Sequence, residues 1–232
     1  MSLILDKYDF DTIIKVPPEG VRMAIDIETP MIEDSLKKDK RIDKILIPEI
    51  CLSKRINKIA SEVLKDYSKE DTLNIVVVLS GGILFASDFS RLLYSISAVN
   101  TDFHFIKTSV YEGEIKKDNE EQREVKVVLP INDIAKKDIL IVEDIVDQGF
   151  TLSWLIDYLK NEKNVNSVRT CVLLNKQLEN PSPNVKQLRE NLHIDYSGFY
   201  IPDRWVAGYG CDVADSFRNM PFIVTINEEY YK

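Results

Sequence analysis

The sequence predicts an α/β fold with a mostly parallel, twisted sheet and helices on both faces. Two observations carry this prediction. First, continuous apolar runs of strand length alternate with segments whose apolar residues recur at helical spacing. Ile75–Leu79 and Ile139–Val142 are such runs, which are typical of parallel strands covered on both faces. Second, a glycine-containing turn and a helical segment follow each of these runs, as they do in the repeating units of parallel sheets.

The elements can be assigned in order from residue 52, where the pattern changes from irregular to periodic. The expected helices carry their apolar faces over Leu52–Tyr67, Phe85–Ile96 and Leu152–Leu159, and the expected strands are Ile75–Leu79, Phe103–Lys107, Val125–Leu129, Ile139–Val142 and Val168–Leu174. Glu112–Glu124 is highly charged and shows no periodicity, so we expect a long mobile loop there.

The chain of 232 residues is long enough to bury a large core without disulfides or a structural metal. We expect an N-terminal extension over residues 1–48, a core over 49–180, and a C-terminal segment with the final strand over 181–232. The two outer segments would build a small hood that packs with the core as one domain.

The composition excludes several classes of protein. With 30 basic and 38 acidic residues the net charge is −8, which argues against a broad grip on a nucleic-acid backbone and should repel anionic substrates. Asp6, Asp9 and Asp11 interrupt any signal peptide, and Ile75–Ala86 is too short to span a membrane. Three cysteines and two histidines favour neither a disulfide framework nor a zinc site. We therefore expect a cytoplasmic protein without a membrane or nucleic-acid partner.

Ligands of doubly wound sheets bind at the carboxyl ends of the strands. One expected strand ends in Ser80-Gly81-Gly82, where glycines allow a tight turn that presents N–H groups to an anion. An ordinary strand-to-helix turn explains these glycines equally well.

A second strand end is more specific. Glu143 and Asp144 follow four aliphatic residues, and carboxylates there could hold Mg²⁺ or sugar hydroxyls. Asp147-Gln148-Gly149-Phe150-Thr151 then opens a helix, whose N–H groups and dipole suit a phosphate. Together they indicate a sugar phosphate site. The alternative is that Asp147 only caps the helix and Glu143 is solvated.

Ile139–Leu152, read as ILIVEDIVDQGFTL, resembles the phosphoribosyl-diphosphate-binding motif of type I phosphoribosyltransferases, and is most similar to their hypoxanthine-guanine(-xanthine) branch. The resemblance covers roughly residues 42 to 232. Three further motifs occur in the family's order: VVLSGGILFASDF at Val77–Phe89, LLNK at Leu173–Lys176 and GFYIPDRWVAGYGCDVADSFRN at Gly198–Asn219. It implies the Rossmann-like fold of that family.

The resemblance implies a role for each residue at the phosphoribosyl site. Glu143 and Asp144 would meet the ribose hydroxyls, directly or through Mg²⁺. Asp147 would be the general base or proton relay at the purine N7. The backbone of Asp147–Thr151 and the Thr151 hydroxyl would hold the 5′-phosphate.

At the purine site, the resemblance implies that Lys176 hydrogen-bonds the O6 atom and selects 6-oxopurines over adenine. Trp205 would stack on the base, the Val206 main chain would meet its edge, and Asp212 would line the pocket. From the residues alone, Lys176 is a lone cation at a strand end and suits a carbonyl oxygen. Trp205 follows a loop, where a ring is a platform or, alternatively, core filler.

Other roles concern the leaving group. Asp212 would help to bind a second Mg²⁺, and Arg218 would contact the pyrophosphate together with the Ser80-Gly81-Gly82 turn. Tyr111 matches the tyrosine of the family's mobile loop. Without the resemblance, Arg218 is an ordinary surface cation and Asp212 an ordinary turn residue.

The chain also departs from the family's pattern. Ser80 stands where a lysine is usual, Gln148 where a threonine is usual, and Gln177 where an arginine commonly follows the purine-site lysine. Val110-Tyr111 replaces a Ser-Tyr pair. Each loss removes a donor or charge, and a lost charged hydrogen bond costs about 1.5–3 kcal/mol.

The resemblance implies a purine salvage enzyme that joins hypoxanthine or guanine, with xanthine as a third candidate base, to 5-phosphoribosyl-1-diphosphate, giving IMP, GMP or, with xanthine, XMP and pyrophosphate. It also implies Mg²⁺ as cofactor and a homodimer or homotetramer. One alternative is a weakened or inactive relative that binds nucleotide and regulates a partner, which the changes at Ser80 and Gln148 motivate. Another is a Mg²⁺-dependent phosphatase that uses Asp144 or Asp147.

Overall fold

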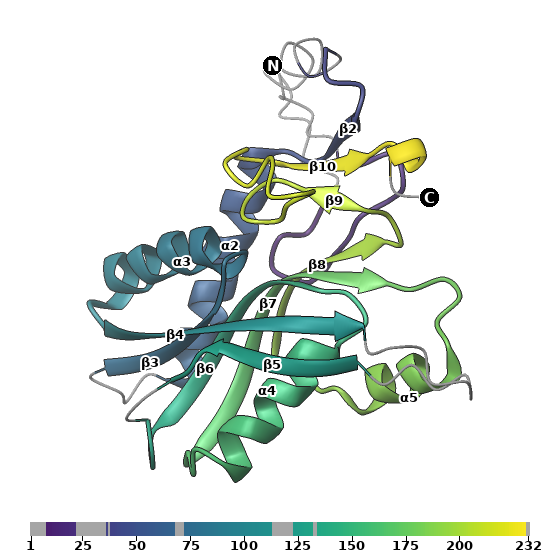
Figure 1. The fold of residues 1–232 in the computed structure, drawn as a ribbon. Coiled ribbons are helices and arrows are strands. Elements are labelled where there is room, and N and C mark those ends of the chain that lie inside the picture. Colours follow the sequence, from purple (N-terminus) through teal and green to yellow (C-terminus); the bar gives the residue numbers. More distant parts are fainter. Residues whose placement is uncertain are drawn as a thin grey trace, which may run out of the picture.

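The computed structural model describes residues 8–21, 36, 38–67, 72–112, 123–131 and 134–230. Within them the chain forms a seven-stranded sheet and a separate three-stranded sheet (Figure 1). The seven-stranded sheet has the order β1-β8-β7-β6-β3-β4-β5. Its strands are β1 (Ile14–Lys15), β8 (Tyr196–Pro202), β7 (Ser167–Gln177), β6 (Asp138–Val146), β3 (Thr72–Leu79), β4 (Asn100–Glu112) and β5 (Arg123–Leu129).

Every neighbouring pair in the large sheet is parallel except β4 and β5, which are antiparallel. The prediction of a mostly parallel sheet is therefore confirmed. The apolar runs explain why its central strands lie where they do. In β3, Ile75 and Val77 point into one apolar cluster while Val76 and Val78 point into another, so both faces of this strand are buried.

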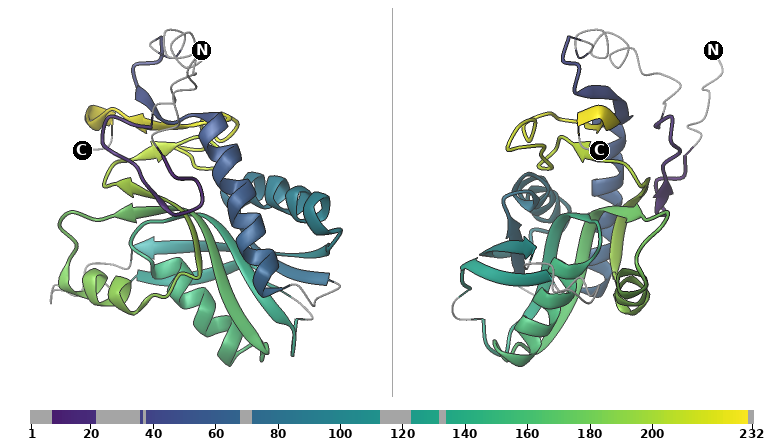
Figure 2. Two further views of the ribbon diagram at one scale, coloured as in Figure 1. Left: turned by 180° about the vertical axis from the view of Figure 1, so that it is seen from behind. Right: turned by 45° about the vertical axis from the view of Figure 1, so that its right-hand side comes forward.

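Helices cover the two faces of the large sheet (Figure 2). The cluster beneath α2 (Glu49–Asp66) and α3 (Gly82–Ser97) contains Ile56 and Phe85. The cluster on the opposite face contains Leu155 from α4 (Phe150–Asn161). A further short helix, α5 (Pro183–Asn191), was not expected from the sequence.

The three-stranded sheet joins one strand from the N-terminal part of the chain to two strands from its C-terminal part. Its order is β2 (Ile42–Ile47), β10 (Ile223–Ile226) and β9 (Val206–Ala207), and both pairings are antiparallel. This sheet, with the short 3-10 helix η1 (Glu228–Tyr230) after β10, is the hood expected from the N-terminal and C-terminal segments. The strands β1 and β8 come from the same outer segments but lie in the large sheet. The domain boundaries at residues 48 and 180 stay a prediction.

The elements at the charged edge are longer than the sequence suggested. β4 and β5 pair as far as Glu112 and Arg123, so both ends of the expected Glu112–Glu124 loop belong to strands. Charged residues are tolerated there because β5 is an edge strand, whose outer side is not covered by another strand. Residues 113–122 of the expected loop lie outside the described residues. Among the described residues, no helix is long and apolar enough to cross a membrane.

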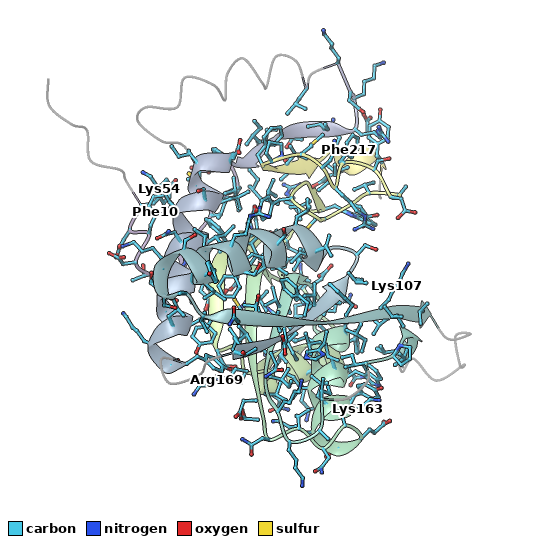
Figure 3. The ribbon with its side chains drawn as sticks, turned by 90° about the vertical axis from the view of Figure 1, so that its left-hand side faces the viewer. Phe10, Lys54, Lys107, Lys163, Arg169 and Phe217 are labelled. Atoms are coloured by element: carbon cyan, nitrogen blue, oxygen red, sulfur yellow. The ribbon has the colours of Figure 1, made fainter. Side chains whose placement is uncertain are left out.

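Arg55 is a buried side chain of α2 that connects this helix to the N-terminal segment and to β8. Its side chain is 1% exposed and pairs with Glu62 of the same helix at 2.7 Å. Its guanidinium also donates to the carbonyls of Phe10, Ser197 and Gly198. The Phe10 ring lies beside Lys54, whose Nζ is 5.2 Å from the ring centroid (Figure 3). These contacts hold residues 8–15 against α2.

We predict that Arg55→Met lowers the free energy of unfolding by at least about 3 kcal/mol, because three buried carbonyls and Glu62 lose their donor. Urea denaturation measures this change. Lys58→Met is the matched control on the same helix. It removes only the exposed Lys58–Asp11 ion pair and should cost less than about 1 kcal/mol. Equal losses in the two variants would contradict the role given to Arg55.

Candidate active site

Two buried carboxyl groups lie in β6. Glu143 is 6% exposed and Asp144 is 9% exposed, and both belong to the strand itself, because β6 continues to Val146. The sequence placed them at the strand's end and left open that Glu143 is solvated; its burial removes that alternative. The Cys211 thiol donates a hydrogen bond to Asp144 Oδ2 at 3.3 Å.

Glycines from two other segments make room for Asp144. A Cβ atom added at Gly81 would lie 2.1 Å from Asp144 Oδ2, so no other residue fits there without displacing the carboxyl group. A Cβ atom added at Gly210 would in turn lie 2.0 Å from the Gly81 carbonyl oxygen. The β3–α3 turn, strand β6 and the turn before Cys211 thus meet in direct contact.

Burial controls the protonation of both carboxyl groups. It raises the pKa of Glu143 well above its ordinary value, and the neighbouring Asp144 charge raises it further. Burial also raises the pKa of Asp144, while the hydrogen bond from Cys211 opposes that rise. Glu143 Oε2 is buried and has no hydrogen-bond partner among the described residues. A group that donates a hydrogen bond or carries positive charge would satisfy this oxygen.

The segment after β6 forms the turn that the sequence predicts to bind a phosphate, which we call the phosphate loop. Asp147, Gln148 and Gly149 connect β6 to the first turn of α4, and Gly149 has a φ of +91°, which glycine adopts without strain. A Cβ atom there would also lie 2.8 Å from Leu188 Cδ2 of α5. A cavity of about 240 Å³ lies over this turn, lined by Glu143, Ile145, Val146, Asp147, Gln148, Gly149, Phe150, Thr151 and Leu152.

A second cavity, of about 370 Å³, adjoins the same loop. Lys176 enters it from the end of β7 and is 8% exposed. Its Nζ pairs with Asp147 Oδ2 at 2.9 Å, and Asp147 lines both cavities. The complete lining is Asp144, Ile145, Asp147, Lys176, Asp203, Arg204, Trp205, Val206, Cys211 and Asp212.

Trp205 and Val206 close this second cavity from the hood. Trp205 is 45% exposed, so its ring is not core filler. Val206 is buried in β9, where Thr225 of β10 pairs with it. The expected purine-site residues therefore lie around one cavity between the large sheet and the hood.

Arg218 and Asp212 form an ion pair at the rim. Arg218 Nη2 lies 2.7 Å from Asp212 Oδ1, and Nη1 donates to the Gly210 carbonyl at 2.8 Å. Among the described residues, no group of three or more His, Cys, Asp or Glu side chains is arranged to hold a metal ion. The oxygen donors of Glu143 and Asp144 fit Mg²⁺ by type. The metal role of Asp212, which here faces Arg218, stays a prediction.

Ser80 and Tyr111 are two further residues that the sequence predicts to contact the ligand. The Leu79–Ser80 peptide bond is cis, and Ser80 is exposed at the start of the turn that reaches Asp144 through Gly81. The backbone of Tyr111 belongs to β4, but its side chain and that of Val110 lie outside the described residues. Their predicted contacts with a ligand stay predictions.

The sequence reasoning missed Arg189 and the helix that carries it. Arg189 Nη2 donates to the Lys176 carbonyl at 3.1 Å and to Asn175 Oδ1 at 2.5 Å. Ser182 caps α5 by accepting from the Val185 N–H, and Pro183 occupies the first turn. This Ser-Pro start is the signal from which the helix could have been found.

A family model described as a phosphoribosyl transferase domain matches residues 50–214. The chain belongs to this family. The matched range includes the ends of β6 and β7 that line the two cavities, the loop after β6 and the turn at Gly81.

Relatives of the phosphoribosyl transferase domain family cover most of the chain. The hypoxanthine-guanine phosphoribosyltransferase of Dictyostelium discoideum is 30% identical over 82% of this chain and 98% of its own length. The hypoxanthine phosphoribosyltransferase of Buchnera aphidicola is 33% identical over 79% and 96%. The solved Trypanosoma cruzi hypoxanthine phosphoribosyl transferase is 30% identical over 83% of this chain and 95% of that chain, with a TM-score of 0.68.

We predict that Glu143→Gln stabilises this phosphoribosyl transferase domain at neutral pH in the absence of ligands. The pKa of Glu143 is higher in the folded than in the unfolded chain, so stability falls as the pH rises between those two values. The amide removes this penalty of about 1–3 kcal/mol at pH 7, and the gain should vanish below about pH 3, where both states are protonated.

Thermal unfolding at a series of pH values measures this gain. Glu190→Gln, on the exposed side of α5, is the control that removes an equal charge without removing a buried carboxyl group. A Glu143→Gln variant no more stable than the wild type at pH 7 would show that Glu143 is not held in a destabilising environment.

Proposed function

We propose that this protein is a purine salvage phosphoribosyltransferase. It would join hypoxanthine or guanine, and also xanthine, to 5-phosphoribosyl-1-diphosphate, giving the nucleoside monophosphate and pyrophosphate. The observation that carries the proposal is the Lys176–Asp147 ion pair. Asp147 lines both the cavity over the β6–α4 turn, which suits a phosphate, and the cavity beneath the hood, which suits a purine base. The names of the relatives support the same reaction.

The phosphoribosyl group would occupy the cavity over the β6–α4 turn. The N–H groups of Gln148–Thr151 and the α4 dipole favour a phosphate dianion there, and the first turn of α4 carries no acidic residue to oppose it. The hydroxyls of the ribose would then lie towards Glu143 and Asp144, where Glu143 Oε2, which has no partner among the described residues, would accept a hydrogen bond.

The purine would lie between the hood and the end of β7. Trp205 is partly exposed and lines this cavity, where its ring would stack on the base. The Lys176 ammonium suits the O6 carbonyl of a 6-oxopurine and disfavours the amino group of adenine, since both are hydrogen-bond donors. The main chain at Val206 would meet the edge of the base.

Asp147 would take or relay the proton at purine N7 as N9 attacks the ribose carbon. Its carboxyl group is about half exposed and already ion-paired with Lys176, which orients it. Arg218, at the rim, would stabilise the departing pyrophosphate. When bound near Glu143 and Asp144, Mg²⁺ would neutralise charge on the diphosphate and the leaving group.

A spectrophotometric assay tests the proposed function. The protein is mixed with Mg²⁺ and the phosphoribosyl diphosphate donor, and absorbance is followed with hypoxanthine, guanine, xanthine and adenine separately. Turnover with 6-oxopurines and not with adenine is the expected result. Donor binding without turnover would favour a regulatory nucleotide-binding protein, and donor-independent phosphate release from phosphomonoesters would favour a phosphatase.

We predict that Asp147→Asn lowers kcat by about 10²–10⁴-fold, because a positioned general base is lost. Donor affinity should change much less, since the loop N–H groups remain. Steady-state kinetics and calorimetric donor binding separate the two effects. Asp157→Asn, exposed on α4, is the control. Equal losses of turnover and of donor binding would contradict the general-base role.

The absence of the family's usual lysine at Ser80 should make activity depend strongly on Mg²⁺. We predict that Ser80→Lys lowers the Mg²⁺ concentration for half-maximal activity and lowers the donor's KM by about tenfold, as one charged hydrogen bond would. Ser53→Lys, the same change on the exposed side of α2, should alter neither value. An unchanged Mg²⁺ requirement in Ser80→Lys would contradict this account.

We also propose that the protein acts in the cytoplasm as a homodimer or homotetramer. Cys51, Cys171 and Cys211 are all buried and form no disulfide, which suits a reducing compartment. The stacked rings of Phe103 and Phe105 are each 38% exposed on β4 and offer apolar surface for a second subunit. Light scattering on the purified protein measures the subunit number.

A further inference from the structure

Arg189 of α5 connects the two loops that line the cavities. Its Cδ lies 3.2 Å from the position that a Cβ atom at Gly149 would take, so its stem packs against the phosphate loop. Its Nη2 holds the Asn175 side chain at 2.5 Å and the Lys176 carbonyl at 3.1 Å. One side chain therefore contacts the loop proposed for the phosphate and the strand end proposed for the base.

The charge of Arg189 is not neutralised by these contacts. Both acceptors are uncharged, and the Nη1 atom is buried without a hydrogen-bond partner among the described residues. Burial lowers the pKa of Arg189, and the negative charge of Asp147 opposes that change. A half-buried guanidinium with neutral partners is costly to the folded protein, so its position favours an anion from outside the chain.

The position of the guanidinium indicates which anion it serves. The stem of Arg189 packs against Gly149 of the loop Asp147–Thr151, whose N–H groups and helix dipole suit a phosphate. Gln148 in this loop is uncharged, and so is Gln177, which follows the purine-site lysine. Arg189 therefore places, from α5, a second positive charge near this loop in addition to that of Lys176, which pairs with Asp147.

We propose that Arg189 is a positioning residue for the 5′-phosphate of the phosphoribosyl group, which it favours through its charge while it holds the loop at Gly149 in place. The proposal rests on the proposed function and assigns to that site a residue outside its sequence motifs. A purely structural role, in which Arg189 only anchors α5, is the competing explanation.

Two substitutions separate the charge from the packing. Arg189→Met keeps an apolar stem against Gly149 and removes the charge, whereas Arg189→Lys keeps the charge and loses the planar fork. Lys186→Met is the matched control, because it removes an equal charge from the exposed side of the same helix. The measurements are calorimetric Kd values for IMP, steady-state KM values for donor and base, and thermal melting.

We expect Arg189→Met to weaken the binding of IMP and to raise the KM for the phosphoribosyl donor, each by about 10- to 100-fold, as the loss of a charged interaction would. The KM for hypoxanthine, which carries no phosphate, should change less than about threefold. Arg189→Lys should recover most of the loss, and Lys186→Met should match the wild type.

Other outcomes would overturn the role of Arg189. An unchanged Kd for IMP in Arg189→Met would do so, and so would equal increases of the KM values for donor and base. A third such outcome is an Arg189→Lys variant that melts like the wild type but binds IMP as weakly as Arg189→Met. If the methionine variant melts much earlier than the wild type, the lysine variant decides by the same donor-against-base comparison. A wild-type protein that binds neither IMP nor donor would instead contradict the proposed function itself.

Discussion

The burial of two carboxyl groups side by side in β6 is the constraint on which the rest of the site depends. Glu143 and Asp144 are held among apolar strands, with their pKa values raised and one oxygen of Glu143 without a partner among the described residues. Such a pair costs folding energy in the absence of a ligand. We propose that the fold retains this pair because it binds a cation or a hydroxyl donor, in the way that active sites sacrifice stability for function.

The surrounding structure is arranged to accept this pair. The parallel sheet brings the carboxyl ends of β3, β6 and β7 to one edge, which places the turn at Gly81, the phosphate loop and Lys176 together. Gly81 permits the backbone to approach Asp144 where a side chain would collide, and Gly210 permits a close approach to the Gly81 carbonyl. The hood then closes the cavity around Lys176 with Trp205 and Val206. The pairing of β2 with β10 builds the hood and so shapes the site.

Local patterns explain what the sequence could predict. The apolar runs at Ile75 and Ile139 identify central parallel strands, because strands buried on both faces read that way. The phosphate loop follows from one such run. Features that depend on long-range contact were not predictable: β1 pairs with β8, and Cys211 donates to Asp144 across 67 positions. The sequence pattern did not predict α5, because Val185 is its one buried residue and the helix shows hardly any apolar periodicity.

The net charge of −8 makes an anionic substrate an apparent contradiction, which local chemistry resolves. We propose that Glu143 and Asp144 recruit Mg²⁺. Arg189, Arg218 and the N–H groups of the loop would supply the remaining attraction for phosphate. Acidic residues would thereby make a polyanionic donor acceptable. The central claim is thus that donor binding requires the cation that these buried carboxylates recruit.

Isothermal titration calorimetry with the phosphoribosyl diphosphate donor, in excess Mg²⁺ and again in EDTA, tests this claim most directly. We expect clear binding in Mg²⁺ and an affinity at least about 100-fold weaker in EDTA. Equal affinity under the two conditions would contradict it.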